Sequence, residues 1–295
     1  MWLTNSSIGR KLVMAITGAA LILFVTFHVL MNAVALISPA SYNAICAFLG
    51  ANWYALVASM GLAALFIIHI IYALWLTVQN RRARGTARYA VSTRPPQVEW
   101  SSKNMLVLGI VVVAFLVVHL IQFWAKMQLT ELLECAPAEI EGVEAAPQSG
   151  TLFLQAAFSC IWTPIIYIIG FVALWFHMTH GFWSMFQSAG WNNDIWIKRL
   201  KTIGCWWTTI VIGLFVAQAV VFTVMANRAD KPYVTCPELQ EQYAIFAEEY
   251  NEKLAGAEAT DDVIPANSEC VEECAADCGD NCECSEDCTN CADAE

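Results

Sequence analysis

The sequence predicts an all-α membrane protein built as a bundle of five transmembrane helices. The chain has 295 residues, 58% of them hydrophobic, and its mean hydropathy is +0.53. It contains five apolar runs without acidic residues, each close to the roughly 20 residues that a spanning helix needs. We place the spans at 12–37, 53–79, 104–126, 152–187 and 202–227.

The first span also has features of a cleavable signal peptide, with basic residues before it and small ones, Ala33 and Ala35, near its end. The apolar stretch 12–37 is much longer than the usual core of about 7–15 residues in such a signal, so we expect a retained helix.

The fourth span is the longest. We expect it to tilt or to extend beyond the lipid.

The net charge of −11 averages two unlike parts. Residues 1–228 hold 7 acidic and 13 basic residues, whereas 229–295 hold 19 acidic residues and two Lys. The bases cluster before span one, between spans two and three, and between spans four and five: Arg10, Lys11, Arg81, Arg82, Arg84, Arg88, Arg94, Lys103, Lys198, Arg199 and Lys201. Because excess Lys and Arg mark the cytoplasmic side, we predict the N-terminus inside and the C-terminus outside a bacterial inner membrane.

All histidines of the chain fall inside spans: His28, His69, His119, His177 and His180. Ionisable residues inside a bilayer are costly and tend to be functional. Imidazole suits iron, and haem b needs two axial imidazoles from facing helices of an apolar bundle. Zinc fits less well, because structural zinc prefers four convergent ligands that include Cys.

Depth sorts four of these histidines into pairs. At about 1.5 Å per residue, His28 and His119 lie roughly 25 and 24 Å from the cytoplasmic ends of their spans, and His69 and His177 roughly 18 and 20 Å. We therefore predict two stacked haems b. His28 and His119 would ligate the outer iron, and His69 and His177 the inner one.

One His on each of four successive spans, followed by a span without any, resembles the single-subunit, two-haem membrane anchor of succinate dehydrogenase and fumarate reductase. The resemblance covers roughly residues 1–228. It rests on FHVLMN at 27–32, FIIHIIY around His69, FLVVHLIQ around His119 and FHMTHGFWSMFQSAGW at 176–191. A cytochrome of the bc type would instead carry paired histidines on each of two helices.

This resemblance implies that the chain passes electrons between a quinone, such as menaquinone, and two cytosolic subunits. One partner would carry FAD and the other iron–sulfur clusters. It also implies that the dicarboxylate site lies on a partner and not on this chain. The expected partners are these subunits, the quinone and the lipid bilayer, and no nucleic acid is expected.

Further residues have weaker assignments. His180 could bond a haem propionate, carry a proton or satisfy a neighbouring helix. Hydroxyl and basic groups within reach of inner propionates, which can equally reflect topology, are Ser6, Ser7, Arg10, Lys11, Ser184 and Lys198. Near the outer haem, the polar groups expected around a quinone are Asn32, Ser41, Tyr42 and Asn43.

Glycines precede the ligand candidates by seven to ten residues and could admit a porphyrin edge: Gly18, Gly61, Gly109 and Gly170. Only Gly170 clearly shares the helical face of its histidine, His177. Glycine is also common at helix contacts in membranes.

The sequence therefore divides into a membrane domain, 1–228, and an acidic exported tail, 229–295. Seven Cys lie in 270–295. These Cys could form disulfides or bind a soft metal. Because the tail has few apolar residues to build a core, we expect it to be disordered. Two alternative functions remain open: the membrane cytochrome b of a hydrogenase or formate dehydrogenase, and a haem-free transporter or scaffold.

Overall fold

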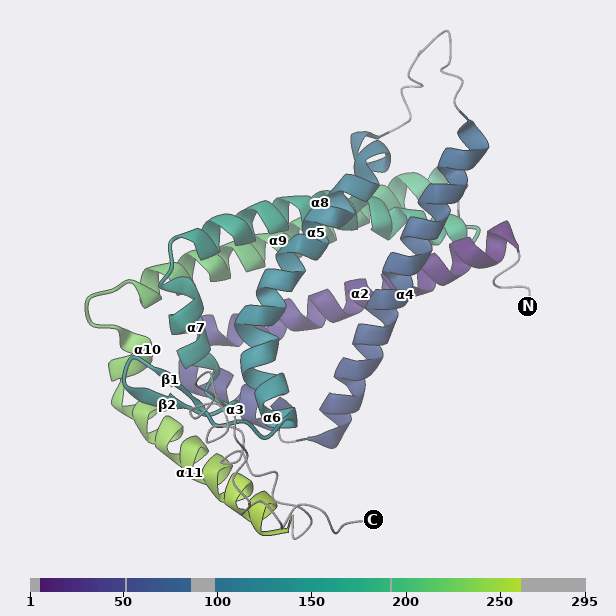
Figure 1. Cartoon of the computed structure of the whole chain (residues 1–295). Coiled ribbons are helices and arrows are strands. Elements are labelled where there is room, and N and C mark those ends of the chain that lie inside the picture. The colour runs from purple at the N-terminus through teal and green to yellow at the C-terminus, as the bar shows by residue number, and fades with distance from the viewer. Residues whose placement is uncertain (1–5, 51, 86–98, 192, 261–295) are drawn as a thin grey trace, which may run out of the picture. The chain divides into compact units, whose positions relative to one another are not determined.

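The computed structural model describes residues 6–50, 52–85, 99–191 and 193–260, most of which are helical (Figure 1). Five helices in these ranges are long and apolar enough to cross a membrane, as predicted. They are α2 (Ser7–Ala33, continued by the 3-10 helix η1, Val34–Leu36), α4 (Trp53–Arg84), α5 (Trp100–His119), α8 (Trp162–Ser188) and α9 (Asp194–Ala226).

Capping side chains set the starts of two spanning helices. The Ser6 hydroxyl accepts the N–H of Gly9 at 2.9 Å, so α2 begins at Ser7. The Asn193 side chain accepts two N–H groups of the first turn of α9. Both helices begin earlier than the predicted 12 and 202, because apolar patterning does not detect a polar first turn.

The fourth predicted span, 152–187, is wrong as a single helix. Its first part forms a separate short helix, α7 (Gly150–Phe158), and α8 begins only at Trp162. Pro164 lies in the first turn of α8, where a missing N–H is tolerated but a continuous helix from α7 is not. Most of α7 is buried in protein, which explains its apolar character without lipid.

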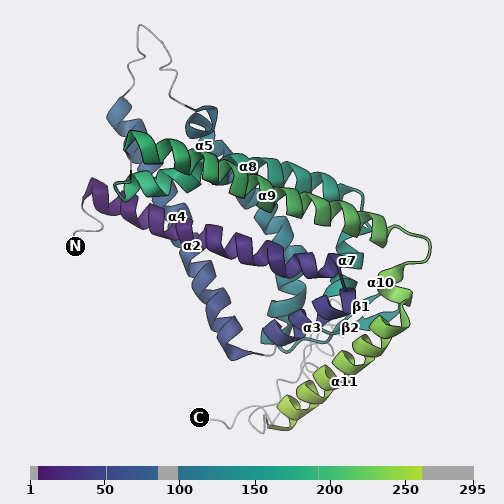
Figure 2. The ribbon, with the colours of Figure 1, turned by 180° about the vertical axis from the view of Figure 1, so that it is seen from behind.

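Four of the spanning helices enclose the histidines. Helix α2 packs against α4 and α8, and α5 packs against α8 and touches α4. The diagonals of this four-helix arrangement are therefore α2 with α5 and α4 with α8. Helix α9 lies beside α8 and also contacts α2, as the two opposite views show (Figures 1 and 2).

Short elements form a second layer at the end of the bundle where α2 finishes, which we call the outer layer. It consists of α3 (Pro39–Gly50), α6 (Thr130–Leu132), β1 (Ala138–Ile140), β2 (Val143–Ala145), α7, α10 (Pro232–Thr235) and α11 (Pro237–Thr260). Strands β1 and β2 pair antiparallel, with Ala138 opposite Ala145. Among the largest buried side chains here are Tyr233, Tyr243 and Phe153.

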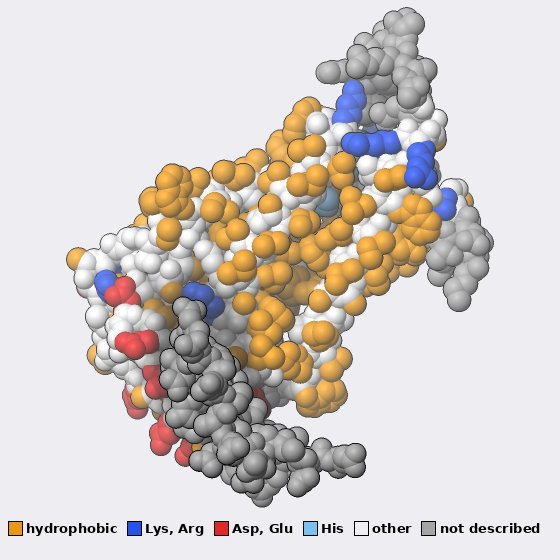
Figure 3. Space-filling view, viewed as in Figure 1, with side chains coloured by type: hydrophobic (Ala, Val, Ile, Leu, Met, Phe, Trp, Pro, Cys, Tyr) orange, Lys and Arg blue, Asp and Glu red, His pale blue; other side chains and the backbone are white. Residues whose placement is uncertain are grey.

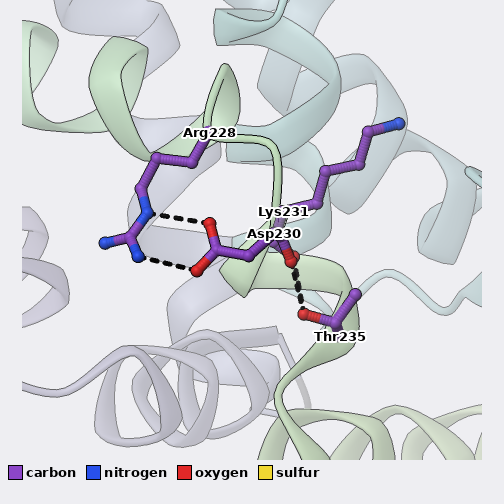
Figure 4. A network of polar contacts seen from close by, with 4 residues as sticks. All are labelled: Arg228, Asp230, Lys231 and Thr235. Carbon is purple, nitrogen blue, oxygen red and sulfur yellow. Dashed lines mark hydrogen bonds and ion pairs between the residues drawn. The ribbon is translucent and has the colours of Figure 1, made fainter.

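The turn between α9 and α10 is closed by polar contacts (Figure 4). Arg228 donates from Nε and Nη2 to the two carboxylate oxygens of Asp230, at 2.8 and 2.6 Å. The Thr235 hydroxyl donates to the backbone carbonyl of Asp230. Lys231, in the left-handed conformation at φ 41°, donates to Glu141 of the β1–β2 turn at 2.7 Å. These contacts stabilise the connection between the end of α9 and the outer layer.

The chain divides into two compact units, Met1–Asn251 and Glu252–Glu295. Because α10 and α11 are helical and most of α11 belongs to the first unit, the expectation of a disordered tail from residue 229 is wrong as far as residue 260. The seven Cys of 270–295 lie outside the described residues.

Charge separates toward the ends of the first unit. Lys and Arg side chains gather where α2 begins and α4 ends, Asp and Glu gather on the outer layer, and hydrophobic side chains cover the surface between them (Figure 3). This separation matches the predicted charge map.

Candidate functional site

Four histidines lie in two pairs across the diagonals of the bundle. The ring centroids of His28 on α2 and His119 on α5 are 5.7 Å apart. Those of His69 on α4 and His177 on α8 are 6.3 Å apart. The structure thus brings together the pairs that depth indicated, from helices that are not nearest neighbours.

The two pairs lie at different levels. The Thr17 hydroxyl is 3.0 Å from Nδ1 of His69, and Thr17 precedes His28 on the same helix by 11 residues. At the α-helical rise this places the pairs about 16 Å apart along α2. The pair His69–His177 is nearer the basic end, and His28–His119 nearer the outer layer.

Aromatic rings lie against both imidazoles of the outer pair. Phe24 stacks on His28 with centroids 5.4 Å apart, and Phe115 and Phe123 lie against His119 at 6.1 and 5.3 Å. These rings give both imidazoles apolar neighbours.

A chain of polar groups leads away from His119. Its Nδ1 is 3.2 Å from the hydroxyl of Tyr167. Tyr167 donates to Oε1 of Gln122 at 2.9 Å, and Gln122 donates to the hydroxyl of Thr163 at 3.2 Å. Gln122 lies in the π-helix η2 (Leu120–Leu129), which begins directly after His119.

A second polar chain reaches His28 from the outer layer. Asn32 donates to the backbone carbonyl of His28 at 2.8 Å, and its amide nitrogen lies 3.4 Å from the imidazole Nδ1. The Tyr42 hydroxyl donates to Oδ1 of Asn32 at 3.3 Å. Asn32 and Tyr42 are two of the four residues expected near a quinone, and these contacts connect both of them to the outer pair.

Asn43 has a different place. It is fully buried, and its Oδ1 accepts the N–H and the hydroxyl of Thr151 at 2.9 and 2.8 Å. Its amide donates to Gln242 of α11 at 3.3 Å. Asn43 therefore joins α3, α7 and α11, and the expectation that it lies at a quinone is not supported by its contacts. Ser41, beside it in α3, is exposed.

Two glycines lie beside the inner pair. A side chain at Gly18 would begin 3.5 Å from Cε1 of His69, and one at Gly109 would begin 3.8 Å from Cε1 of His177. Gly170 is instead packed against Phe115, whose Cγ lies 2.4 Å from where a Cβ would be. Gly170 thus lies at a close contact of α8 with α5. That it admits a porphyrin edge on the face of His177 stays a prediction.

The residues present fit a haem b at each pair. Metal–imidazole bonds of about 2.0 Å on both sides of an iron would set the ring centroids roughly 6 Å apart, close to the observed 5.7 and 6.3 Å. The donor set is two imidazoles, and Nδ1 of His177 is buried without a hydrogen-bond partner among the described residues. Within those residues, no three His, Cys, Asp or Glu side chains gather in a way that could hold a metal ion.

His180 contacts another helix. Its Nδ1 lies 3.6 Å from Oε2 of Glu99, the residue before α5, and Nζ of Lys201 lies 2.7 Å from Oε1 of the same carboxylate. Burial favours a raised pKa for Glu99, but the hydrogen bond and charge of Lys201, with a smaller contribution from His180, hold that pKa below its usual value. Of the three roles predicted for His180, contact with a neighbouring helix is the one visible here.

The other residues assigned to propionates lie at the basic end. The Arg10 guanidinium is 5.6 Å from the ring centre of Trp75 on α4, and Lys11 is exposed. Ser184 is half-buried, and its backbone carbonyl accepts the hydroxyl of Ser188 at 3.0 Å.

Several residues at the site were missed by sequence reasoning: Thr17, Glu99, Gln122, Tyr167 and Lys201. The available signal was a hydroxyl or amide in the middle of an apolar span, which applies to Thr17, Gln122 and Tyr167. Thr17 and Tyr167 are also buried.

No model of a known protein family matches the chain, and comparisons with curated proteins and with solved structures find no match either.

Proposed function

We propose that the chain is the di-haem cytochrome b subunit that anchors a succinate dehydrogenase or fumarate reductase complex in the membrane. The observation that carries this proposal is the meeting of His28 with His119 and of His69 with His177, at two levels of one apolar bundle. The sequence resemblance supports the choice of complex. In this proposal the chain is the quinone-reactive subunit of an oxidoreductase.

Each pair of histidines would hold one haem b, which supplies reversible one-electron transfer when bound. The imidazoles fix its position from two helices. Phe24, Phe115 and Phe123 provide apolar contacts for the outer pair. Gly18 and Gly109 leave room beside the inner pair. Electrons would pass between the two levels, over the separation of about 16 Å along α2.

The basic end would face the cytoplasm. Positive charge at this end supports that orientation, and the exposed side chains of Arg81, Arg82, Lys103 and Lys198 offer a surface for the FAD and iron–sulfur subunits. Crosslinks from Lys103 or Lys198 to those subunits would support this orientation. Crosslinks confined to residues beyond 228 would overturn it.

A quinone would react near the outer pair. Asn32 and Tyr42 connect His28 to the outer layer through side-chain hydrogen bonds. Replacing Asn32 by Leu or Tyr42 by Phe should reduce quinol oxidation while succinate oxidation by a soluble acceptor is retained. Loss of quinol turnover on changing Ser184 or His180 instead would place the quinone at the inner pair.

The test of the main proposal is haem quantification with single substitutions. The purified chain should contain two haems b, and His28→Ala or His119→Ala should remove the outer one, while His69→Ala or His177→Ala removes the inner one. His180→Ala is the matched control, since it removes an imidazole from the same helix as His177 and should leave both haems. A folded wild-type chain with one haem or none would overturn the proposal.

Two further measurements separate the alternatives. A haem-free transporter or scaffold shows no b-type bands in a reduced-minus-oxidised spectrum. Succinate or fumarate turnover in the co-purified complex distinguishes the proposed complex from a hydrogenase or formate dehydrogenase.

A further inference from the structure

We propose that Thr17 and Tyr167 are positioning residues, which hold His69 and His119 as the tautomers that carry the ring proton on Nδ1 and so leave Nε2 free to bind iron. This inference rests on the proposed function. It assigns a role to two hydroxyls that touch the imidazoles from other helices.

The direction of the hydrogen bond at His69 follows from the surroundings of Thr17. The Thr17 oxygen lies 2.9 Å from the backbone carbonyl oxygen of Val13 and 3.1 Å from that of Met14. Both distances suit donation by the hydroxyl to carbonyls of its own helix, a hydrogen bond that Thr commonly forms inside helices. The single hydroxyl proton of Thr17 therefore points into its own helix. At the Nδ1 contact of 3.0 Å the hydroxyl must accept, and His69 must donate.

The same reasoning applies to His119. The Tyr167 hydroxyl donates its only proton to Oε1 of Gln122 at 2.9 Å. In this orientation the nitrogen of Gln122 donates to the hydroxyl of Thr163 at 3.2 Å. Tyr167 can then only accept at the contact of 3.2 Å, so Nδ1 of His119 is the donor.

Within the described ranges, no such hydroxyl contacts the other two histidines. Nδ1 of His28 lies 3.4 Å from the amide nitrogen of Asn32, on its own helix, and Nδ1 of His177 has no hydrogen-bond partner among these residues. Each pair thus contains one imidazole oriented by a neighbouring helix. The orienting residues also connect the levels, since Thr17 shares α2 with His28, and Tyr167 shares α8 with His177.

An Nδ1–H donor bond makes the imidazole a stronger base and fixes the ring plane. A stronger base favours ferric over ferrous iron, so the hydrogen bond lowers the midpoint potential of that haem. Loss of such an outer contact typically weakens metal binding by about 10- to 100-fold. If ferric haem loses tenfold more affinity than ferrous haem, the midpoint potential rises by about 59 mV for one electron.

The experiment compares Thr17→Val and Tyr167→Phe in the purified, haem-loaded protein by redox titration and by electron paramagnetic resonance of the ferric haems. Thr17→Val should raise the midpoint potential and shift the resonance of the inner haem alone, and Tyr167→Phe those of the outer haem alone. Thr17→Ser keeps the hydroxyl and should restore the wild-type values. Thr77→Val and Tyr72→Phe, both on α4, are matched controls. The Thr77 hydroxyl donates to the carbonyl of Ala73 on its own helix at 2.7 Å, and the Tyr72 ring packs on Trp75.

Unchanged potentials and resonances in both variants, with both haems bound, would overturn this inference and leave the proposed function intact. If Thr17→Val removes the inner haem, recovery in Thr17→Ser supports positioning, and failure of Thr17→Ser to recover it refutes positioning. A wild-type chain without haem overturns the proposed function itself.

Discussion

At the scale of single residues, a polar side chain in an apolar setting has two distinct uses in this protein. Thr17 and Tyr167 touch imidazoles of the histidine pairs. Asn43 touches none in the structure, and instead satisfies the backbone N–H and hydroxyl of Thr151 inside the outer layer. Such a residue cannot be assigned from its type alone, because the partner that satisfies it decides its role.

Asn43→Leu should destabilise the outer layer. The change leaves the buried N–H of Thr151 without an acceptor, which costs about 1–3 kcal/mol. Ser41→Ala, at an exposed position of the same helix, should stay within about 0.5 kcal/mol of wild type. Denaturant unfolding in detergent, followed by circular dichroism, measures both. Wild-type stability together with lost quinol oxidation in Asn43→Leu would assign Asn43 to the quinone after all.

Gly18→Val should prevent haem binding at the inner pair. The new side chain begins 3.5 Å from Cε1 of His69 and would fill the space beside this imidazole. Gly213→Val is the control, since nothing lies within 4 Å of its added Cβ and α9 carries no histidine. Haem content per chain should fall from two to one in the first variant and stay at two in the second. A haem content of two per chain in Gly18→Val would show that the inner haem does not occupy this space.

At the scale of the elements, sequence predicted the five long helices well because each is a continuous apolar run with bases at one end. It failed where an apolar run serves another purpose. Helix α7 is apolar because it is buried in the outer layer, so it merged with α8 in the prediction. Helix α11 is polar on average, and its high acid content suggested disorder. Most of it nevertheless packs within the first unit, where the hydroxyls of Tyr243 and Tyr250 donate hydrogen bonds to backbone carbonyls.

The histidine pairs could be predicted because depth along a helix is fixed by residue count. Their orienting groups could not, because a contact such as that of Tyr167 with His119 depends on how α5 and α8 rotate about their axes. For the same reason, the close approach of α5 and α8 at Gly170 could not be predicted from the sequence.

Gly170→Ala should weaken the packing of α8 against α5. Its Cβ would overlap Cγ of Phe115 and lie 2.9 Å from Cβ of the same residue, an atom that cannot move away without shifting the backbone of α5. Overpacking of this kind typically costs about 1–3 kcal/mol. Adding Phe115→Leu should relieve part of the loss, which a double-mutant cycle in thermal unfolding can measure. Additive effects in that cycle would contradict a direct contact.

At the scale of the whole molecule, the outer layer sets an upper pH limit on stability. Burial raises the pKa of Tyr233 and of Tyr243 from 10.0 to about 12 each, with a further rise at Tyr233 from the nearby Tyr243. A group with a raised pKa contributes its full stability below the ordinary value and loses it as the pH rises through the folded-state value. Each tyrosine should therefore cost roughly 2–3 kcal/mol once ionised.

We expect the outer layer to unfold cooperatively between about pH 10 and 12. Tyrosinate absorbance and circular dichroism, recorded together against pH, should change in step. Tyr54→Phe, at an exposed position, should not move the transition. Formation of all tyrosinates near pH 10 without loss of structure would contradict the buried state of Tyr233 and Tyr243.

The diagonal placement of the histidines also has a consequence for biosynthesis. The chain enters the membrane from its N-terminus, and a pair can form only when both of its helices have been inserted. His28 and His119 are both present once the third spanning helix is in place, whereas His69 must wait for α8, 108 residues further along the chain, to bring His177. The outer pair can therefore meet first, and α4 stays without its partner imidazole until the fourth spanning helix arrives.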